Sequence, residues 1–331
     1  MVGRWGFKAL KHMKHLEQVV SETAIAIFAC DRPEHLNRML NSLIRNIDLD
    51  CFAIFIFVDF PRTKSTMVRH GEVLELIKNF QKKFEVVSVQ VQSSNLGLSN
   101  SVRQGVELCL TNFTKVIVLE DDLVLSVNYL NYMTLTLAIF EENEKIGSIS
   151  GYTYSQFPFF VKRNLIATLR HSSWGWATWK DRWIKIDWSL LSNDSKMEFY
   201  LQELGKISPD LPGMLIDLKN KRVDSWAILF NLNMAILDMR ALHPRYSLVT
   251  NIGGDGSGTN VRLAKIEKVF NENEISPMLL DLEDFSISRW YDWYLAFKHS
   301  RWNPFPYSFF VVCFLYFRRN ICKIQKYFLL K

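Results

Sequence analysis

Residues 116–122 read VIVLEDD, four apolar residues followed directly by Glu120, Asp121 and Asp122. A short apolar run of this kind predicts a buried strand, and the acids then lie at its carboxyl end. Adjacent carboxylates repel one another unless a cation or hydrogen-bond donors compensate them. The segment therefore predicts a strand that carries a charged cluster to the edge of a sheet. The simpler alternative is an acidic cap for a helix that starts near Ser126.

Strand and helix patterns alternate in the residues before this segment. Pro33 suits the first turn of a helix, and the apolar residues after it recur at the spacing of one helix face. Strands that alternate with helices imply a mainly parallel sheet covered on both faces, so the predicted fold class is α/β and Rossmann-like. The expected strands are 24–29, 52–58, 87–91 and 116–119, and the expected helices begin at Pro33, near Met67 and at Leu98.

Polar residues follow the other predicted strands. Ligands of parallel sheets bind beyond the carboxyl ends of the strands, where Asp31, Asp59, Asn95 and the acids at 120–122 all fall. Asp31 and Asp59 are suited to accept hydrogen bonds from a base or ribose, and Arg32 is suited to a phosphate. Each alone fits a loop-capping role, but as a set at one sheet edge they indicate a binding site.

The acidic residues also fit a metal. A hard divalent ion such as Mn2+ or Mg2+ takes oxygen ligands, uses one or two carboxylates, and completes its shell with water and phosphates. The sequence has no GxGxxG after its first strand and no GxxxxGK[ST], which disfavours a dinucleotide dehydrogenase and a P-loop enzyme. The predicted cofactor is therefore Mn2+ or Mg2+ held with a phosphorylated ligand.

Composition and charge limit the partners. A chain of 331 residues with 48% apolar content is long enough for one large globular domain. The net charge of +6 is modest and is not gathered in one run, so no nucleic-acid partner is expected. An odd number of cysteines and no apolar run before Thr23 favour a cytoplasmic protein with reduced thiols.

The C-terminal segment is basic and aromatic. After Asp292 there are seven Lys or Arg and no acid, and the apolar run 305–317 falls short of the roughly 20 residues that span a bilayer. Two expectations stay open for this extension. It either makes peripheral contact with the anionic inner face of the cytoplasmic membrane, or forms a helix packed on the domain.

Five segments together carry a family resemblance. They resemble GT-A-fold glycosyltransferases, most closely bacterial family-2-like sugar transferases and more distantly the N-acetylglucosaminyltransferase I group, which shares the ACDR and EDD patterns. The likeness covers about residues 23–260, and the tryptophan-rich segment is its most specific part. The segments are AIAIFACDRP (24–33), FVD (57–59), SSNLGLSNSV (93–102), VIVLEDD (116–122) and SSWGWATWKDRW (172–183).

The resemblance implies a GT-A-like fold and a nucleotide-sugar site. It implies that Asp31, Arg32 and Asp59 contact the nucleoside and diphosphate, and that Asn95 and Gly97 line the donor pocket. For the acidic trio it implies that the last acid, Asp122, coordinates the metal, while the first two, Glu120 and Asp121, face sugar or ribose.

An inverting enzyme needs a carboxylate that deprotonates the acceptor hydroxyl. Our candidate is Asp224 in the sequence RVDSW, although the family often places an acid directly after the tryptophan, where this chain has Ala227. A helix cap is the alternative role for Asp224. Three further acids stay open as substitutes: Asp181, Asp187 and Asp217.

Two further segments are expected around the acceptor. His171, Trp174, Gly175 and Trp176 belong to the tryptophan-rich segment; tryptophan faces suit sugar rings, and a glycine allows close backbone approach. Core packing is the competing role for the tryptophans. The loop 251–260 has the composition of a lid that closes over bound donor, and its residues include Gly253, Gly254, Asp255 and Gly256.

The predicted function is transfer of a sugar from a UDP- or GDP-sugar donor to a saccharide or lipid-linked acceptor in bacterial surface polysaccharide assembly. A sugar-phosphate nucleotidyltransferase and a non-catalytic carbohydrate-binding protein are the alternatives. The expected organisation is a basic segment at 1–22, a nucleotide-sugar-binding half at 23–150, an acceptor-binding and catalytic half of the same domain at 151–285, and the basic aromatic segment at 286–331.

Overall fold

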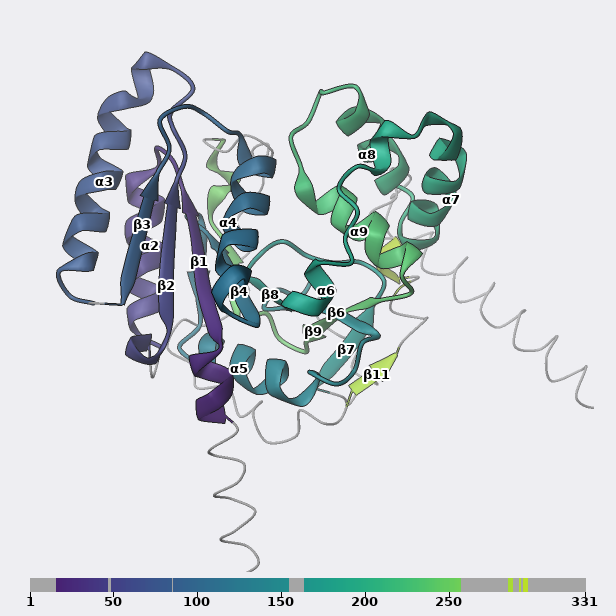
Figure 1. The fold of residues 1–331 in the computed structure, drawn as a ribbon, viewed down its shortest axis with the longest axis horizontal. Coiled ribbons are helices and arrows are strands. Elements are labelled where there is room, and N and C mark those ends of the chain that lie inside the picture. Colours follow the sequence, from purple (N-terminus) through teal and green to yellow (C-terminus); the bar gives the residue numbers. More distant parts are fainter. Residues whose placement is uncertain are drawn as a thin grey trace, which may run out of the picture.

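A computed structural model describes residues 16–46, 49–84, 86–154, 164–256, 285–287, 292 and 294–296. The described residues form a nine-stranded sheet and a separate two-stranded sheet, with helices on both faces of the larger one (Figure 1). The strand order in the large sheet is β11-β7-β9-β6-β8-β4-β1-β2-β3.

The first half of the chain builds the parallel part of this sheet. Strand β1 pairs in parallel with β2 and β4, and β2 pairs in parallel with β3, as the alternation of strands and helices predicted. The elements are β1 (Thr23–Ala29), α2 (Pro33–Ile44), β2 (Ala53–Val58), α3 (Met67–Gln81), β3 (Val87–Val91), α4 (Leu98–Asn112) and β4 (Lys115–Glu120).

The second half extends the same sheet. Strand β8 runs antiparallel to β4 and carries the sheet on to β6, β9, β7 and β11. These strands are β6 (Ile146–Ser150), β7 (Leu165–Thr168), β8 (Trp176–Trp179), β9 (Arg240–Pro244) and β11 (Phe285–Ile287). The two-stranded sheet pairs β5 (Leu123–Leu125) with β10 (Val249–Asn251).

Helices α7, α8 and α9 form a group of their own in Figure 1. Helix α9 also contacts α4. Within the described part of the chain, every helix is too short or too polar to cross a bilayer. The remaining helices are α5 (Tyr129–Ile139), α6 (Lys180–Trp183), α7 (Met197–Ile207), α8 (Leu211–Lys219) and α9 (Trp226–Ile236). Short 3-10 turns are η1 (Leu49–Cys51), η2 (Lys64–Thr66), η3 (Leu190–Ser192), η4 (Asp194–Lys196) and η5 (Gly253–Asp255).

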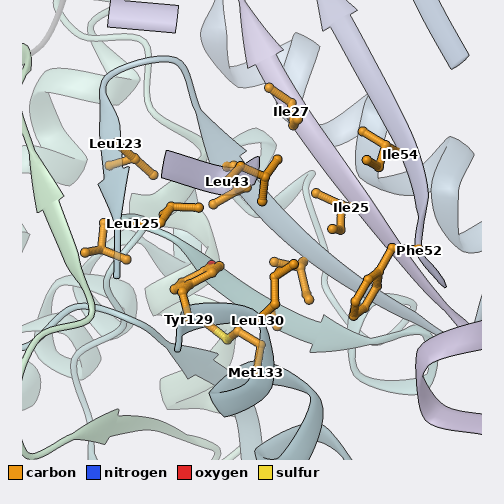
Figure 2. Packing of buried hydrophobic residues seen from close by; sticks show 14 of the residues in the cluster. Ile25, Ile27, Leu43, Phe52, Ile54, Leu123, Leu125, Tyr129, Leu130 and Met133 are labelled. Atoms are coloured by element: carbon orange, nitrogen blue, oxygen red, sulfur yellow. The ribbon is translucent and has the colours of Figure 1, made fainter. Parts of the chain in front are cut away.

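Alternate residues of the central strands feed two separate cores. On one face Ile25 and Ile27 of β1 pack with α2, α3 and α5, and Figure 2 shows them among Leu43, Tyr129 and Met133. The side chains of the next residues along β1 point to the opposite face, as the two-residue period of a strand requires. Burial on both faces explains why these strands are apolar throughout.

The opposite face is closed by α4, α6 and α9 and is rich in aromatic rings. Trp176 of β8 is fully buried and stacks on Trp226 of α9, with ring centroids 4.8 Å apart. Phe230 lies 5.3 Å from the Trp176 ring. The tryptophan-rich segment therefore supplies much of this second core.

A charged residue lies completely buried at the start of β4. The Lys115 ammonium pairs with Glu22 at 2.9 Å and with Glu141 at 2.8 Å. Its side chain has no exposed surface, whereas both carboxylates reach solvent. These pairs compensate the buried charge, which would otherwise be costly to desolvate.

Candidate functional site

The structure brings the predicted strand-end residues to one pocket of about 260 Å3. Asp31 follows β1, Asp59 follows β2, and Glu120 ends β4, with Asp121 and Asp122 directly after it, so parallel pairing places all of them at the same sheet edge. The first turns of α4 close the pocket from the other side. The lining residues are Phe28, Ala29, Cys30, Asp31, Arg32, Phe57, Asp59, Arg62, Thr63, Thr66, Asn95, Leu98, Ser101, Glu120, Asp121 and Asp122.

Arg32 binds the acid cluster, defined here as Glu120, Asp121 and Asp122. Its Nη1 donates to Asp122 at 3.0 Å, its Nε donates to Asp121 at 3.3 Å, and its Nη2 also contacts Asp121. The Asp121 and Asp122 side chains are only 4% and 7% exposed, so this pairing offsets the cost of burying two charges. The helix-cap alternative for these acids is wrong, because β5 follows directly and α5 begins only at Tyr129.

Burial changes the protonation of two acids of the cluster, Glu120 and Asp121. Desolvation raises the pKa of Glu120 and of Asp121, and the neighbouring Asp122 charge raises both further, while Arg32 lowers them. Burial alone lowers the pKa of Arg32, but the charges of Asp121 and Asp122 raise it above its ordinary value. Arg32 therefore remains a cation inside the pocket.

Asp59 organises the loop that precedes α4. Its carboxylate accepts hydrogen bonds from the backbone N–H groups of Phe60 (2.9 Å), Leu96 (2.8 Å) and Gly97 (3.0 Å), and from the Asn95 amide (3.2 Å). Gly97 has a φ of +79°, a conformation that favours glycine. Asp59 and Asn95 thus fix the loop that forms one wall of the pocket.

Asp224 lies beside this loop, brought there by the turn before α9. The Ser99 N–H donates to Asp224 at 3.4 Å, and a Cβ added at Gly97 would lie 2.6 Å from the Asp224 carboxylate. Its alternative role as a cap of α9 is not what the structure shows, because Ser225 occupies the cap position. Asp224 therefore joins the second half of the chain to the loop before α4.

The first part of the glycine-rich loop packs directly on the acid cluster. The Asn251 amide donates to Asp122 at 3.2 Å, and the Ile252 N–H donates to the Asp122 carbonyl at 2.8 Å. A Cβ added at Gly253 would overlap the Asp122 carboxylate and lie 3.2 Å from Arg32 Nη1. Gly254 is buried in the same turn, Asp255 pairs with His35 at 3.3 Å, and Gly256 is exposed. Residues 257–260 lie outside the described residues.

Comparison with known proteins assigns the family. The model of the GNT-I family matches residues 7–186, which is more than half of the chain and contains both the ACDR and the EDD segments. The chain belongs to the GNT-I family. This confirms the resemblance to the N-acetylglucosaminyltransferase I group, and the sheet described above confirms the GT-A-like α/β fold class. None of the curated protein sequences matches the chain.

Solved structures show a distant likeness that concerns the fold alone. The mannosyltransferase PcManGT from Pyrobaculum calidifontis, in complex with GDP-Man and Mn2+, is 11% identical over 48% of this chain and 45% of that chain, with a TM-score of 0.35. GalNAc-T7 with UDP, GalNAc and Mn2+ is 10% identical over 73% and 46%, with a TM-score of 0.47. S. aureus TarS with UDP is 14% identical over 47% of each chain, with a TM-score of 0.33. The chain thus spans less than half the length of each of these structures.

Two of the expected acceptor residues of this GNT-I-family protein lie in the core. His171 is 2% exposed, bonds Ser148 at 2.9 Å, and packs between the rings of Trp176 and Phe230. Trp176 is fully buried. Neither residue lines the pocket, so the prediction that they contact a sugar is wrong. Their rings are buried in the aromatic core instead.

Trp174 lies partly in the core and partly at the surface, and Gly175 packs against core residues. Trp174 is half-buried and meets Tyr152 edge to face at 4.4 Å, so part of its ring remains accessible. Gly175 has a φ of +59°, and a Cβ there would lie 2.8 Å from Val249. The glycine does permit a close approach, but the approaching group is the protein's own core, not a ligand.

The three substitute acids lie away from the pocket, whereas one cation that was not predicted, Arg62, lies in it. Asp181 pairs with Arg182, Asp217 pairs with Arg222, and Asp187 bonds Ser189 at the surface, and none of these acids lines the pocket. Arg62 does line it, together with Thr63 and Thr66. The signal in the sequence was the polar run RTKST that follows the acid at the end of β2.

The side chains of the pocket suit a divalent ion that takes only a few of its ligands from the protein. Among the residues that the structure describes, no three His, Cys, Asp or Glu side chains converge in the manner of a closed metal site. A hard ion needs only one or two carboxylates when phosphates complete its shell. Asp122, whose carboxylate belongs to the acid cluster of the pocket, is suited to be that ligand in this GNT-I-family chain.

Proposed function

We propose that this protein is a glycosyltransferase that uses a nucleoside-diphosphate sugar, a UDP- or GDP-sugar, and transfers the sugar to a saccharide or lipid-linked acceptor with inversion. The observation that supports it best is the pocket of a GNT-I-family chain in which Asp31, Arg32, Arg62 and the acid cluster meet at the ends of parallel strands. Carboxylates for a metal and cations for phosphates are what such a donor requires.

Each group in the pocket has a proposed task. Asp31 accepts hydrogen bonds from the nucleoside, and Arg32 and Arg62 bind the diphosphate. Asp59 holds the loop before α4 in shape through its four hydrogen bonds. Asp122 holds Mn2+ or Mg2+, which when bound neutralises the charge of the departing diphosphate.

Asp224 is the proposed general base. A carboxylate on the acceptor side accepts the proton of the attacking hydroxyl while the bond between sugar and diphosphate breaks. Asp224 is not itself among the residues that line the pocket, but it lies against Gly97 and Ser99 at the start of α4. This position supports the role, because Leu98 and Ser101 of the same helix line the pocket. Ala227, which lies in α9, offers no carboxylate for the task.

The test is release of the nucleoside diphosphate from UDP- and GDP-sugars with Mn2+ present. We expect Asp122→Ala to lower this rate at least 100-fold, because removal of a charge-stabilising group costs about that much. Its free energy of unfolding is measured alongside, because Asp122 also accepts hydrogen bonds from Arg32 and Asn251. Release of pyrophosphate from a sugar phosphate and a nucleoside triphosphate would instead identify a nucleotidyltransferase. Stabilisation by a donor that is never turned over would identify a binding protein.

The acceptor and the site of action are part of the same proposal. Surface polysaccharide assembly at the inner face of a bacterial cytoplasmic membrane rests on the basic aromatic segment 286–331, most of which lies outside the described residues. Sedimentation with anionic vesicles, compared for the full chain and a chain truncated after Ala296, tests the membrane contact. Equal sedimentation of both chains would contradict it.

A further inference from the structure

Arg32 is bound to the acid cluster through all three of its side-chain nitrogens. Nε and Nη2 contact Asp121, and Nη1 contacts Asp122. The Arg32 side chain is 16% exposed, and its guanidinium carries the one positive charge in contact with these two nearly buried carboxylates in the described part of the chain. The pair of carboxylates that a metal would approach is therefore already neutralised in part by the protein itself.

The surroundings of Asp122 leave little room for a second cation. One carboxylate oxygen accepts from Arg32 at 3.0 Å, and the other accepts from the Asn251 amide at 3.2 Å. Gly253 packs so closely that even one added carbon would overlap the carboxylate. A divalent ion placed on the oxygen that faces Arg32 would meet a positive guanidinium, which it repels.

Arg32 has a second class of partner within reach of the same pocket. A planar guanidinium binds phosphate through two parallel hydrogen bonds as well as it binds a carboxylate. A diphosphate in this pocket would bring negative charge that attracts both Arg32 and the ion. The acid cluster and the diphosphate therefore compete for Arg32, and Arg32 and the ion compete for Asp122.

We propose that Arg32 is the resident counter-ion of the acid cluster, and that it excludes the divalent ion until a diphosphate draws the guanidinium away. The ion then binds weakly to the free protein and strongly together with the nucleotide. This inference rests on the proposed function for the identity of the diphosphate. The competition between Arg32 and the ion rests on the contacts alone.

The experiment is a Mn2+ titration of the full chain followed by electron paramagnetic resonance of free Mn2+. Without nucleotide, we expect Arg32→Met to bind Mn2+ at least tenfold more tightly than the unmodified protein. With UDP, and separately with GDP, the order should reverse for the nucleotide that binds, and the variant should bind Mn2+ at least tenfold more weakly. A purely structural role of Arg32 would not reverse the order.

Two further variants serve as a matched control and as a second test of the competition. Arg69→Met removes the same charge from an exposed ion pair with Glu34 on the outside of α3, and it should behave as the unmodified protein in both titrations. Arg32→Lys keeps the charge but cannot span two carboxylates, so it should bind free Mn2+ more tightly than the unmodified protein. This variant carries the test if circular dichroism shows that Arg32→Met is unfolded.

The outcomes separate the two proposals. If neither Arg32→Met nor Arg32→Lys binds Mn2+ more tightly than the unmodified protein in the absence of nucleotide, the competition is overturned. If the variants bind Mn2+ more tightly but no nucleotide changes the titration of any protein, the competition stands and the proposed function fails.

Discussion

A single carboxylate, Asp59, shapes one wall of the pocket. Its four hydrogen bonds bind Phe60, Asn95, Leu96 and Gly97, so its removal leaves three backbone N–H groups without this acceptor. An unsatisfied buried donor costs about 1–3 kcal/mol. We expect Asp59→Ala to lower the free energy of unfolding in urea by about 3 kcal/mol, and Asp59→Asn, which keeps one acceptor oxygen, by less. Equal stability of Asp59→Ala and the unmodified protein would contradict this role.

Gly253 gives a second prediction for one residue. Its Cβ position overlaps the Asp122 carboxylate, so Gly253→Ala must displace Asp122, Arg32 or the loop itself. We expect at least a tenfold loss of Mn2+-dependent nucleotide affinity in a calorimetric titration. Gly213→Ala is the matched control, because an added carbon at Gly213 of α8 meets nothing within 4 Å. Similar affinity of both variants would show that the loop yields without cost.

The start of α4 shows how an element depends on one backbone conformation. Gly97 holds a φ of +79° and its Cβ position lies 2.6 Å from Asp224. The backbone at Gly97, with a φ of 79° and a ψ of 161°, lies in a region that essentially only glycine occupies, and it costs a residue with a side chain about 1–3 kcal/mol. We therefore expect Gly97→Ala to lose at least that much stability on thermal unfolding and to lower the turnover rate. Gly71→Ala, in open space on α3, should instead gain about 0.5–1 kcal/mol. A stable, active Gly97→Ala would exclude a role for Asp224 at this position.

The strands and helices of the parallel half were predictable because a local sequence pattern indicates each of them. Apolar runs marked β1, β2 and β4, and Pro33 begins α2 as predicted. The three-residue strands β5 and β10 were not predicted, because their pairing joins residues about 125 positions apart and leaves no local pattern. Strand β8 was not predicted either. Its tryptophans were assigned to a ligand surface, and their burial depends on contact with α9, which the local sequence does not indicate.

In the pocket, too, local features were predicted and contacts between distant residues were not. Local rules placed Asp31, Asp59 and the acid cluster at strand ends, and parallel pairing then brought them together. The ion pairs of Arg32 were not predictable, because the partners lie 89 and 90 residues away and a phosphate was the simpler partner for a loop arginine. The contact of Asp224 with Ser99 spans 125 residues and was likewise hidden.

At the scale of the whole molecule, buried histidines tie stability to pH. Burial lowers the pKa of His171 well below its usual value, and burial also lowers the pKa of His243. The folded protein therefore resists a proton that the unfolded chain accepts below about pH 6.5. Their contribution is fully present above that pH and is lost as the pH falls below it.

This linkage gives a measurable difference between two proteins. Between pH 7.5 and pH 5.5, the free energy of unfolding of His171→Phe should rise relative to that of the unmodified protein, because the unfolded variant has no proton to take up at that site. The raised pKa values of Glu120 and Asp121 act in the opposite direction, but they cancel in the comparison of the two proteins. Parallel pH profiles in urea titrations would show that His171 does not contribute.

Strand β4 carries an ionisable side chain at both of its ends, Lys115 at the start and Glu120 at the finish. A slip of two residues along its neighbours would keep the apolar faces matched, yet it would drag an ammonium group into hydrocarbon and away from Glu22 and Glu141. The axial position of the strand is therefore locked from the far side of the molecule. The backbone that spaces the acid cluster is therefore held in register by ion pairs made outside the pocket.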